Sequence, residues 1–215
     1  MDTRYSRNNP SPRYRELLDL YRKMHQEGEQ FSGLPAEKTF TGHSLVPQAR
    51  RILELIDMTG ARTILDYGCG KGEQYKASPV VIPGEGEYHS VQDYWVVDSI
   101  HCYDPNYLPF STLPTGTFDG VVSTDVLEHC PEPDLPWILD EIFGFARLFV
   151  FANVACYPAK KRLANGENAH CTIRPPEWWT RLIGEVAANH PQVKWKFVVQ
   201  FQQDGVLHET PITNY

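Results

Sequence analysis

Residues 63–72 of the chain read Thr-Ile-Leu-Asp-Tyr-Gly-Cys-Gly-Lys-Gly. The first five predict a short buried strand, and the glycines at every second position after it predict a sharp turn. Because glycine has no Cβ, such a turn lets the backbone approach a ligand closely. In an α/β protein, a strand that ends in this way forms one wall of a crevice at the carboxyl edge of a parallel sheet, where nucleotide-like ligands bind.

The rest of the chain alternates predicted strands with predicted helices. Strands are expected at residues 63–67, 96–103, 118–124, 148–153 and 193–202. Helices are expected at residues 13–27, 44–58, 135–145 and 176–188, whereas the proline- and glycine-containing residues 73–93 predict an elaborated loop or a shortened helix. This alternation predicts an α/β fold with a doubly wound, mostly parallel sheet that is covered by helices on both faces.

The chain has 215 residues, of which 41% are hydrophobic and 22% are charged, as in an ordinary globular protein. Its formal net charge of −7 argues against a nucleic-acid partner, which would require a basic face. No apolar run resembles a signal peptide or reaches the ~18 residues of a membrane span, so no membrane partner is expected. The five cysteines form no CxxC pair, and we interpret them as buried reduced thiols of a cytoplasmic protein.

Three motifs follow one another in the chain: the glycine turn, Tyr103-Asp104-Pro105, and residues 118–129, which end in Val-Leu-Glu-His. As a set they resemble the class I S-adenosylmethionine-dependent methyltransferases over about residues 45–155. The GxGxxG spacing of Rossmann dehydrogenases is absent. The resemblance implies an S-adenosyl-L-methionine-binding, Rossmann-like domain at residues 44–215, preceded by a helical lid within residues 1–43. The polar, proline-broken residues 1–12 predict a mobile tail before that helix. Core packing explains the apolar stripe of that helix equally well.

The resemblance also implies a cofactor site, which consists of Asp66, Gly68, Cys69, Gly70, Asp104, Thr124, Asp125 and Val126. In this site the glycine turn lies against the methionine and ribose parts of the cofactor. Asp66 fixes the turn or the cofactor amino group, and Asp104 accepts hydrogen bonds from the ribose hydroxyls. The alternative for Asp104 is a plain Asp-Pro turn.

Adenine recognition departs from the family pattern. Only thirteen residues separate Asp104 from Phe118, which leaves too little chain for the family's usual helix and third strand. The acid that often touches adenine at the end of that strand therefore has no match here. Adenine contacts are then expected from Tyr103, Pro105, Ser123 or the loop at residues 73–93.

Candidate catalytic residues follow the predicted strand at 148–153. Residues 153–160 and residues 166–179 both leave the carboxyl end of the sheet, where the acceptor pocket of this architecture would lie. We expect His170 and Tyr157 to face the reacting centre, with Asn153 or Asn168 as an orienting amide, and a histidine of near-neutral pKa could accept a proton. The alternative is that His170 only fixes its loop. His129 is as well explained by burial as by proton transfer, and no metal site is predicted.

Three functions remain open at this stage. The first is methyl transfer from S-adenosylmethionine to a small-molecule substrate by in-line displacement at the sulfonium. The second is intramolecular cyclisation of the same cofactor with release of methylthioadenosine, as in the azetidine-2-carboxylate synthases of this fold family. The third is a catalytically inactive cofactor-binding subunit. The sequence identifies neither the acceptor nor the oligomeric state.

Overall fold

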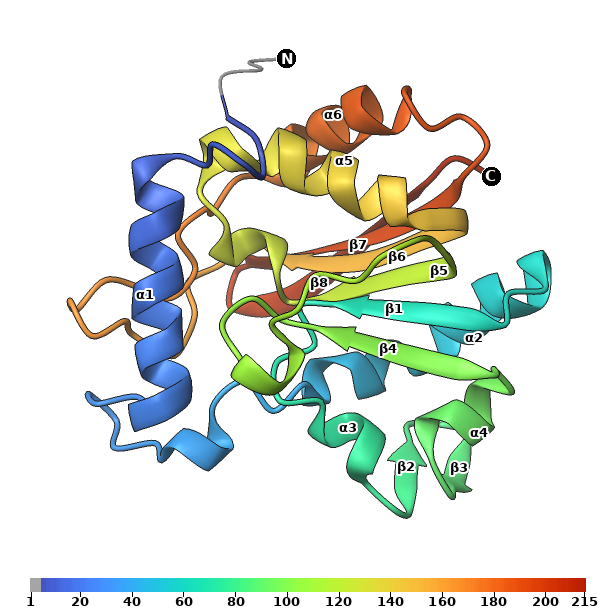
Figure 1. Cartoon of the computed structure of the whole chain (residues 1–215), viewed down its shortest axis with the longest axis horizontal. Helices are drawn as coiled ribbons and strands as arrows, with labels where there is room; N and C mark the ends of the chain where they lie inside the picture. The colour runs from blue at the N-terminus through green and yellow to red at the C-terminus, as the bar shows by residue number, and fades with distance from the viewer. Residues whose placement is uncertain (1–4) are drawn as a thin grey trace.

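A six-stranded sheet in the order β4-β1-β5-β6-β7-β8 forms the centre of the computed structural model, which describes residues 5–215 (Figure 1). Its strands are β1 (Thr63–Tyr67), β4 (Ser99–Tyr103), β5 (Phe118–Thr124), β6 (Ala146–Ala155), β7 (Lys194–Gln203) and β8 (Val206–Thr213). Neighbours from β4 to β7 are parallel, whereas β8 returns antiparallel along β7 at the edge. Because β4 lies on one side of β1 and β5 on the other, the strand order reverses beside β1.

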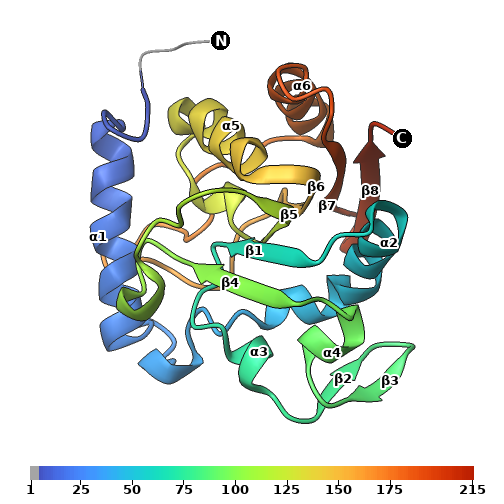
Figure 2. The same ribbon diagram turned by 45° about the vertical axis from the view of Figure 1, so that its right-hand side comes forward.

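Helices cover both faces of this sheet (Figure 2). One face packs on α2 (Ala49–Thr59) and α4 (Val91–Trp95), and the other packs on α5 (Leu135–Phe145) and α6 (Pro176–Ala187). Successive strand residues alternate between the two cores, since Ile64 packs with the first pair of helices and Leu65 with the second. The prediction of an α/β fold with a mostly parallel sheet and helices on both faces is therefore confirmed.

The predicted loop at residues 73–93 contains short regular elements. These are α3 (Glu73–Lys76), β2 (Val80–Ile82), β3 (Gly86–Tyr88) and α4, and β2 and β3 form a separate two-stranded hairpin. Strand β8 was not predicted. The described residues also include 3₁₀ turns at Ala36–Lys38, His43–Gln48, Leu108–Phe110, Leu127–His129 and Glu132–Asp134. The predicted helix at residues 44–58 is thus a 3₁₀ turn that leads into α2.

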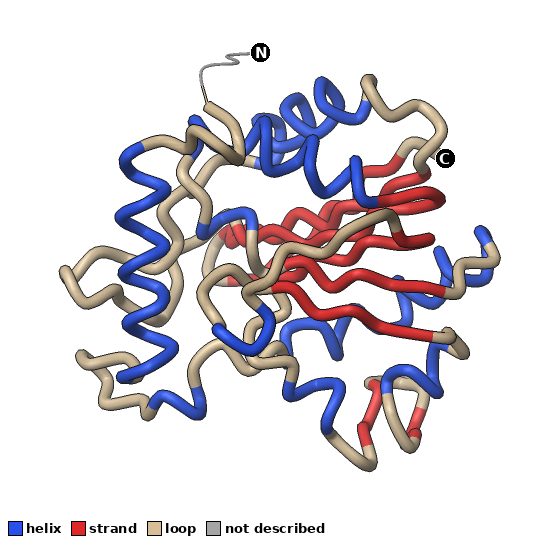
Figure 3. Tube along the Cα trace, viewed as in Figure 1, coloured by secondary structure: helices blue, strands red, loops and turns tan. Residues whose placement is uncertain are grey.

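Helix α1 (Pro12–Glu27) stands across the carboxyl ends of the strands (Figure 1). Ser11 caps its first turn by accepting a hydrogen bond from the Tyr14 amide at 3.0 Å, and Pro12 occupies the first helical position, where its missing N–H costs little. Gly28, at φ 85°, ends the helix. Figure 3 shows the loops that leave the sheet gathered between its edge and α1. Helix α1 therefore closes the edge at which the sequence predicts a ligand.

The segment before α1 is attached to the sheet rather than free. The Arg7 guanidinium donates to the hydroxyls of Tyr103 at 3.0 Å and Tyr67 at 2.9 Å, and it forms an ion pair with Glu141 of α5. The sequence predicts a mobile tail at residues 1–12, whereas Arg7 of this segment contacts three partners, at the ends of β1 and β4 and within α5. Residues 1–4 lie outside the described residues.

We predict that Arg7→Ala lowers the free energy of unfolding by about 2 kcal/mol, because it leaves the Glu141 carboxylate and two tyrosine hydroxyls without their shared donor. Denaturant unfolding followed by circular dichroism measures this loss. The matched control is Arg15→Ala, since Arg15 is exposed on α1. Equal stability of the two variants would contradict the anchoring role of Arg7.

Candidate functional site

The glycine turn after β1 is held by backbone hydrogen bonds to β4. The amides of Gly68 and Cys69 both donate to the Tyr103 carbonyl, at 2.7 Å and 3.1 Å. Gly68 and Gly70 have φ values of 89° and 58°, in the left-handed region. A Cβ at Gly68 would lie 2.3 Å from Val126, and one at Gly70 would lie 2.2 Å from the Phe40 carbonyl oxygen. Both positions therefore require glycine.

Asp104, directly after β4, joins this turn to the next loop. One carboxylate oxygen accepts a hydrogen bond from the Gly70 amide at 3.0 Å, and the other accepts from the Asn106 amide at 2.8 Å. The side chain is buried, and burial raises the pKa of Asp104 to about 6. Each oxygen keeps a lone pair that a ligand hydroxyl can use.

Residues after β5 supply the next part of the site. Asp125 has a φ of 54°, a left-handed conformation that aspartate tolerates better than most residues. Its Oδ1 accepts a hydrogen bond at 2.5 Å from Asn153 of the neighbouring strand β6. Val126 packs against Gly68, as described above. The ends of β1, β4 and β5 therefore meet beside the point where the strand order reverses.

A cavity of about 520 Å³ lies between these strand ends and α1. From the strand ends it is lined by Gly68, Gly70, Asp104, Pro105, Asn106, Thr124, Asp125 and Val126. From α1 and the segment after it, it is lined by Tyr14, Leu17, Leu18, Tyr21, His25 and Phe40. The volume is within the ~300–1,000 Å³ range of small-molecule sites.

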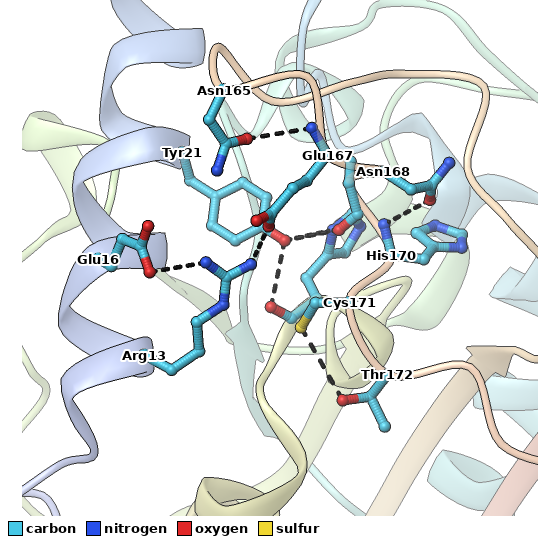
Figure 4. A network of polar contacts seen from close by, with 11 residues as sticks. Arg13, Glu16, Tyr21, Asn165, Glu167, Asn168, His170, Cys171 and Thr172 are labelled. Atoms are coloured by element: carbon cyan, nitrogen blue, oxygen red, sulfur yellow. Dashed lines mark hydrogen bonds and ion pairs between the residues drawn. The ribbon is translucent and has the colours of Figure 1, made fainter.

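Helix α1 is tied to the loop that closes the cavity from the other side (Figure 4). The Tyr21 hydroxyl donates to the Ala169 carbonyl oxygen at 2.6 Å, and Arg13 forms an ion pair with Glu167. On the glycine turn, the Lys71 amide donates to the Phe40 carbonyl at 2.7 Å, which holds Phe40 over the turn. The cover of the cavity is thus fixed by specific polar contacts.

Two histidines of the cavity wall are neutral. His170 Nδ1 donates to the Tyr157 carbonyl at 2.6 Å, and His129 Nδ1 donates to the Ala169 carbonyl at 2.8 Å. Burial lowers the pKa of both, for His129 to about 3. Because a carbonyl oxygen can only accept, Nδ1 carries the proton in each ring and Nε2 is left as an acceptor. The ring centroids are 4.8 Å apart.

Eight of the eleven predicted site residues line this cavity. They are Gly68, Gly70, Asp104, Thr124, Asp125, Val126, Tyr157 and His170. Asp66, Cys69 and Asn153 do not line it. Asn153 lies behind Asp125, and Asn168 fixes the closing loop by accepting from the amides of Ala159 and His170, at 2.9 Å each.

Asp66 is a buried residue of β1 and binds α3 rather than the cavity. Its Oδ2 accepts from Gln74 at 3.0 Å and from the Tyr75 hydroxyl at 2.8 Å, while its Oδ1 is buried without a partner. Burial raises the pKa of Asp66 to about 7 despite these donors. Asp66 therefore holds α3, the short helix that follows the glycine turn, against the end of β1.

Several lining residues escaped the sequence analysis. Among the candidates for adenine contact, Pro105 lines the cavity, but Tyr103, Ser123 and residues 73–93 do not. Asn106, Phe40 and Lys161 line it without having been predicted. Asn106 directly follows the motif Tyr103-Asp104-Pro105, so its position in the chain could have indicated a place at the site. Phe40 and Lys161 lie in irregular segments, where the spacing of residues does not indicate which way a side chain points.

No family model, no curated protein and no solved structure matches the chain. Among residues 5–215, no helix has both the length and the apolar character needed to cross a bilayer. The same residues contain no group of three His, Cys, Asp or Glu side chains arranged to hold a metal ion.

We predict that Asp66→Asn reduces the pH dependence of stability. The folded protein holds the Asp66 proton more tightly than the unfolded chain, whose pKa is near 3.8, so this carboxyl lowers stability as the pH rises from about 4 to 7. Between pH 5 and pH 7.5, the free energy of unfolding should fall by about 2 kcal/mol less in the variant than in the wild type. Urea unfolding at the two pH values measures this, and identical losses would refute the buried, protonated state of Asp66.

Proposed function

We propose that the protein is an S-adenosyl-L-methionine-dependent methyltransferase that acts on a small-molecule acceptor. One observation carries the proposal. The three motifs that resemble the methyltransferases follow adjacent strands, and their ends converge on a single covered cavity beside the strand-order reversal. In open α/β sheets this crevice is where nucleotide-like ligands bind.

The residues at the cavity fit an adenosyl group. Asp104 offers carboxylate lone pairs at the strand end, where the two ribose hydroxyls would donate. Beside it, the Asn106 side chain forms no hydrogen bond with residues 5–215, and its Oδ1 is buried without a partner. Buried amides are normally hydrogen-bonded, and adenine has both donors and acceptors on its edge. Asp104 and Asn106 would therefore hold the nucleoside.

The carboxylates also suit a cationic ligand. Burial raises the pKa values of Asp104 and Asp125, which means that each carboxylate gains from a nearby positive charge. The aromatic rings of Tyr14, Tyr21 and Phe40 line the same cavity, and a ring face stabilises a cation by ~0.5–2 kcal/mol. A sulfonium in this cavity would meet both kinds of group.

The protein's part in the reaction is to position, to exclude water and to accept a proton. When bound, the cofactor supplies an electrophilic methyl group. Helix α1 and the loop at residues 157–170 cover the cavity, which would exclude water from a bound acceptor. The neutral His170 presents Nε2 as an acceptor for a proton released by an amine or hydroxyl acceptor. The pKa of His129, about 3, is too low for this role. The covered cavity and the net charge of −7 favour a small acceptor over nucleic acid.

We predict that Asp104→Asn weakens the binding of S-adenosylhomocysteine at least tenfold, because it removes the negative charge that accepts from the ribose. Isothermal titration calorimetry measures the loss. Asp57→Asn, an exposed aspartate of α2, is the matched control and should bind like the wild type. A wild-type protein that does not bind S-adenosylhomocysteine would overturn the proposed function.

A second prediction concerns the product. Incubation with S-adenosylmethionine and pooled small amines, alcohols and carboxylic acids should release S-adenosylhomocysteine, as measured by mass spectrometry. His170→Ala should slow this release at least tenfold, since the general base is removed. Release of methylthioadenosine without an acceptor would instead identify cyclisation or lysis of the cofactor. Tight binding with no product of either kind would identify a binding subunit.

A further inference from the structure

Two opposite charges line the cavity without forming an ion pair with each other. Asp125 follows β5 and Lys161 lies in the closing loop. Both line the same cavity, and each shifts the pKa of the other toward its charged form. Within residues 5–215, Lys161 forms no ion pair or hydrogen bond through its ammonium group. Its Nζ lies 4.8 Å from the centroid of the Phe40 ring.

The Asp125 carboxylate is held in place from behind. Its backbone has a φ of 54°, and Asn153, which is only 2% exposed, donates to Oδ1 at 2.5 Å. Oδ2 has no protein donor among the described residues. Non-glycine residues in the left-handed region are uncommon and gather at functional sites. Asp125 is therefore oriented by the fold, with one oxygen left for a ligand.

Lys161 has the opposite requirement. Burial lowers the pKa of its ammonium, and Asp125 is among the groups that oppose this shift. A partly buried charge without a counter-ion is costly, and proteins normally pair such a charge. Glu29 also raises the pKa of Lys161, but it forms no ion pair with it among residues 5–215. Its carboxylate instead accepts hydrogen bonds from Ser32 and from the Phe31 and Arg162 amides. The neighbouring His129 and His170 are neutral and provide no anion. A ligand carboxylate would supply the missing partner.

We propose that Asp125 and Lys161 together bind the head group of an α-amino acid, with its ammonium against Asp125 and its carboxylate against Lys161. A simple anion would be attracted by Lys161 but repelled by Asp125. A simple cation would be attracted by Asp125 but repelled by Lys161. An amino-acid head group carries both charges on neighbouring atoms. It has two sources within the proposed function, on which this inference rests: the methionyl end of the cofactor or an amino-acid acceptor.

The test compares S-adenosylhomocysteine with 5′-methylthioadenosine, which lacks the amino-acid head group. Calorimetry is done on the wild type, Lys161→Met and Asp125→Asn. Asparagine tolerates the left-handed backbone and still accepts from Asn153, so Asp125→Asn should fold. The controls Lys38→Met and Asp57→Asn make the same charge changes at exposed positions away from the cavity. Thermal unfolding confirms that each variant is folded.

If the head group belongs to the cofactor, both cavity variants weaken S-adenosylhomocysteine at least tenfold and change methylthioadenosine affinity less than twofold. If it belongs to the acceptor, both adenosyl ligands bind unchanged. In that case a free L-amino acid, titrated into the complex with S-adenosylhomocysteine, binds the wild type and the controls at least tenfold more tightly than the cavity variants.

The inference is overturned if neither S-adenosylhomocysteine nor any of the twenty L-amino acids responds to the cavity variants. It is also overturned if both adenosyl ligands weaken equally, because the two residues would then act on the nucleoside or on the fold. A wild type that binds neither adenosyl ligand rejects the proposed function instead. The amino acids are then titrated into the free protein, and the same comparison of variants decides the inference.

Discussion

The site depends on one carboxylate that joins two strand ends. Asp104 accepts hydrogen bonds from the amides of Gly70 and Asn106, so the glycine turn after β1 and the loop after β4 are held in one arrangement. Gly68 and Gly70 give the turn its shape through their left-handed backbone. Val126 and Phe40 occupy the space that a side chain at Gly68 or Gly70 would need. Asp104 stabilises both loops while keeping lone pairs toward the cavity.

This arrangement concentrates buried ionisable groups around the cavity at a cost in stability. Burial raises the pKa values of Asp66, Asp104 and Asp125 and lowers those of Lys161 and His129. Perturbed groups of this kind gather at functional sites, because a ligand offsets the cost that the free protein bears. The cavity is lined by the Asp104 carboxylate and by the opposite charges of Asp125 and Lys161, which is the basis for proposing a ligand with a sugar, a cation and an amino-acid head group.

The sequence predicted the centre of the sheet well because β1, β5 and β6 are mostly buried on both faces. Residues 63–67 and 118–124 match β1 and β5 at both ends. Strand β8 was missed because its side chains are mostly exposed and leave no periodic apolar signal. Asp104 and Asp125 could be placed at the cavity because each directly follows a predicted parallel strand. Arg7, Phe40 and Lys161 could not, because their partners are remote in sequence and depend on tertiary packing.

The most direct test of the central claim is a crystal structure of the protein with S-adenosylhomocysteine. The account predicts that both ribose hydroxyls lie within hydrogen-bonding distance of the Asp104 carboxylate, with the adenine beside Pro105 and Asn106 and the sulfur directed toward Asp125. Density for the nucleoside elsewhere, or a ribose that makes no contact with Asp104, would contradict it.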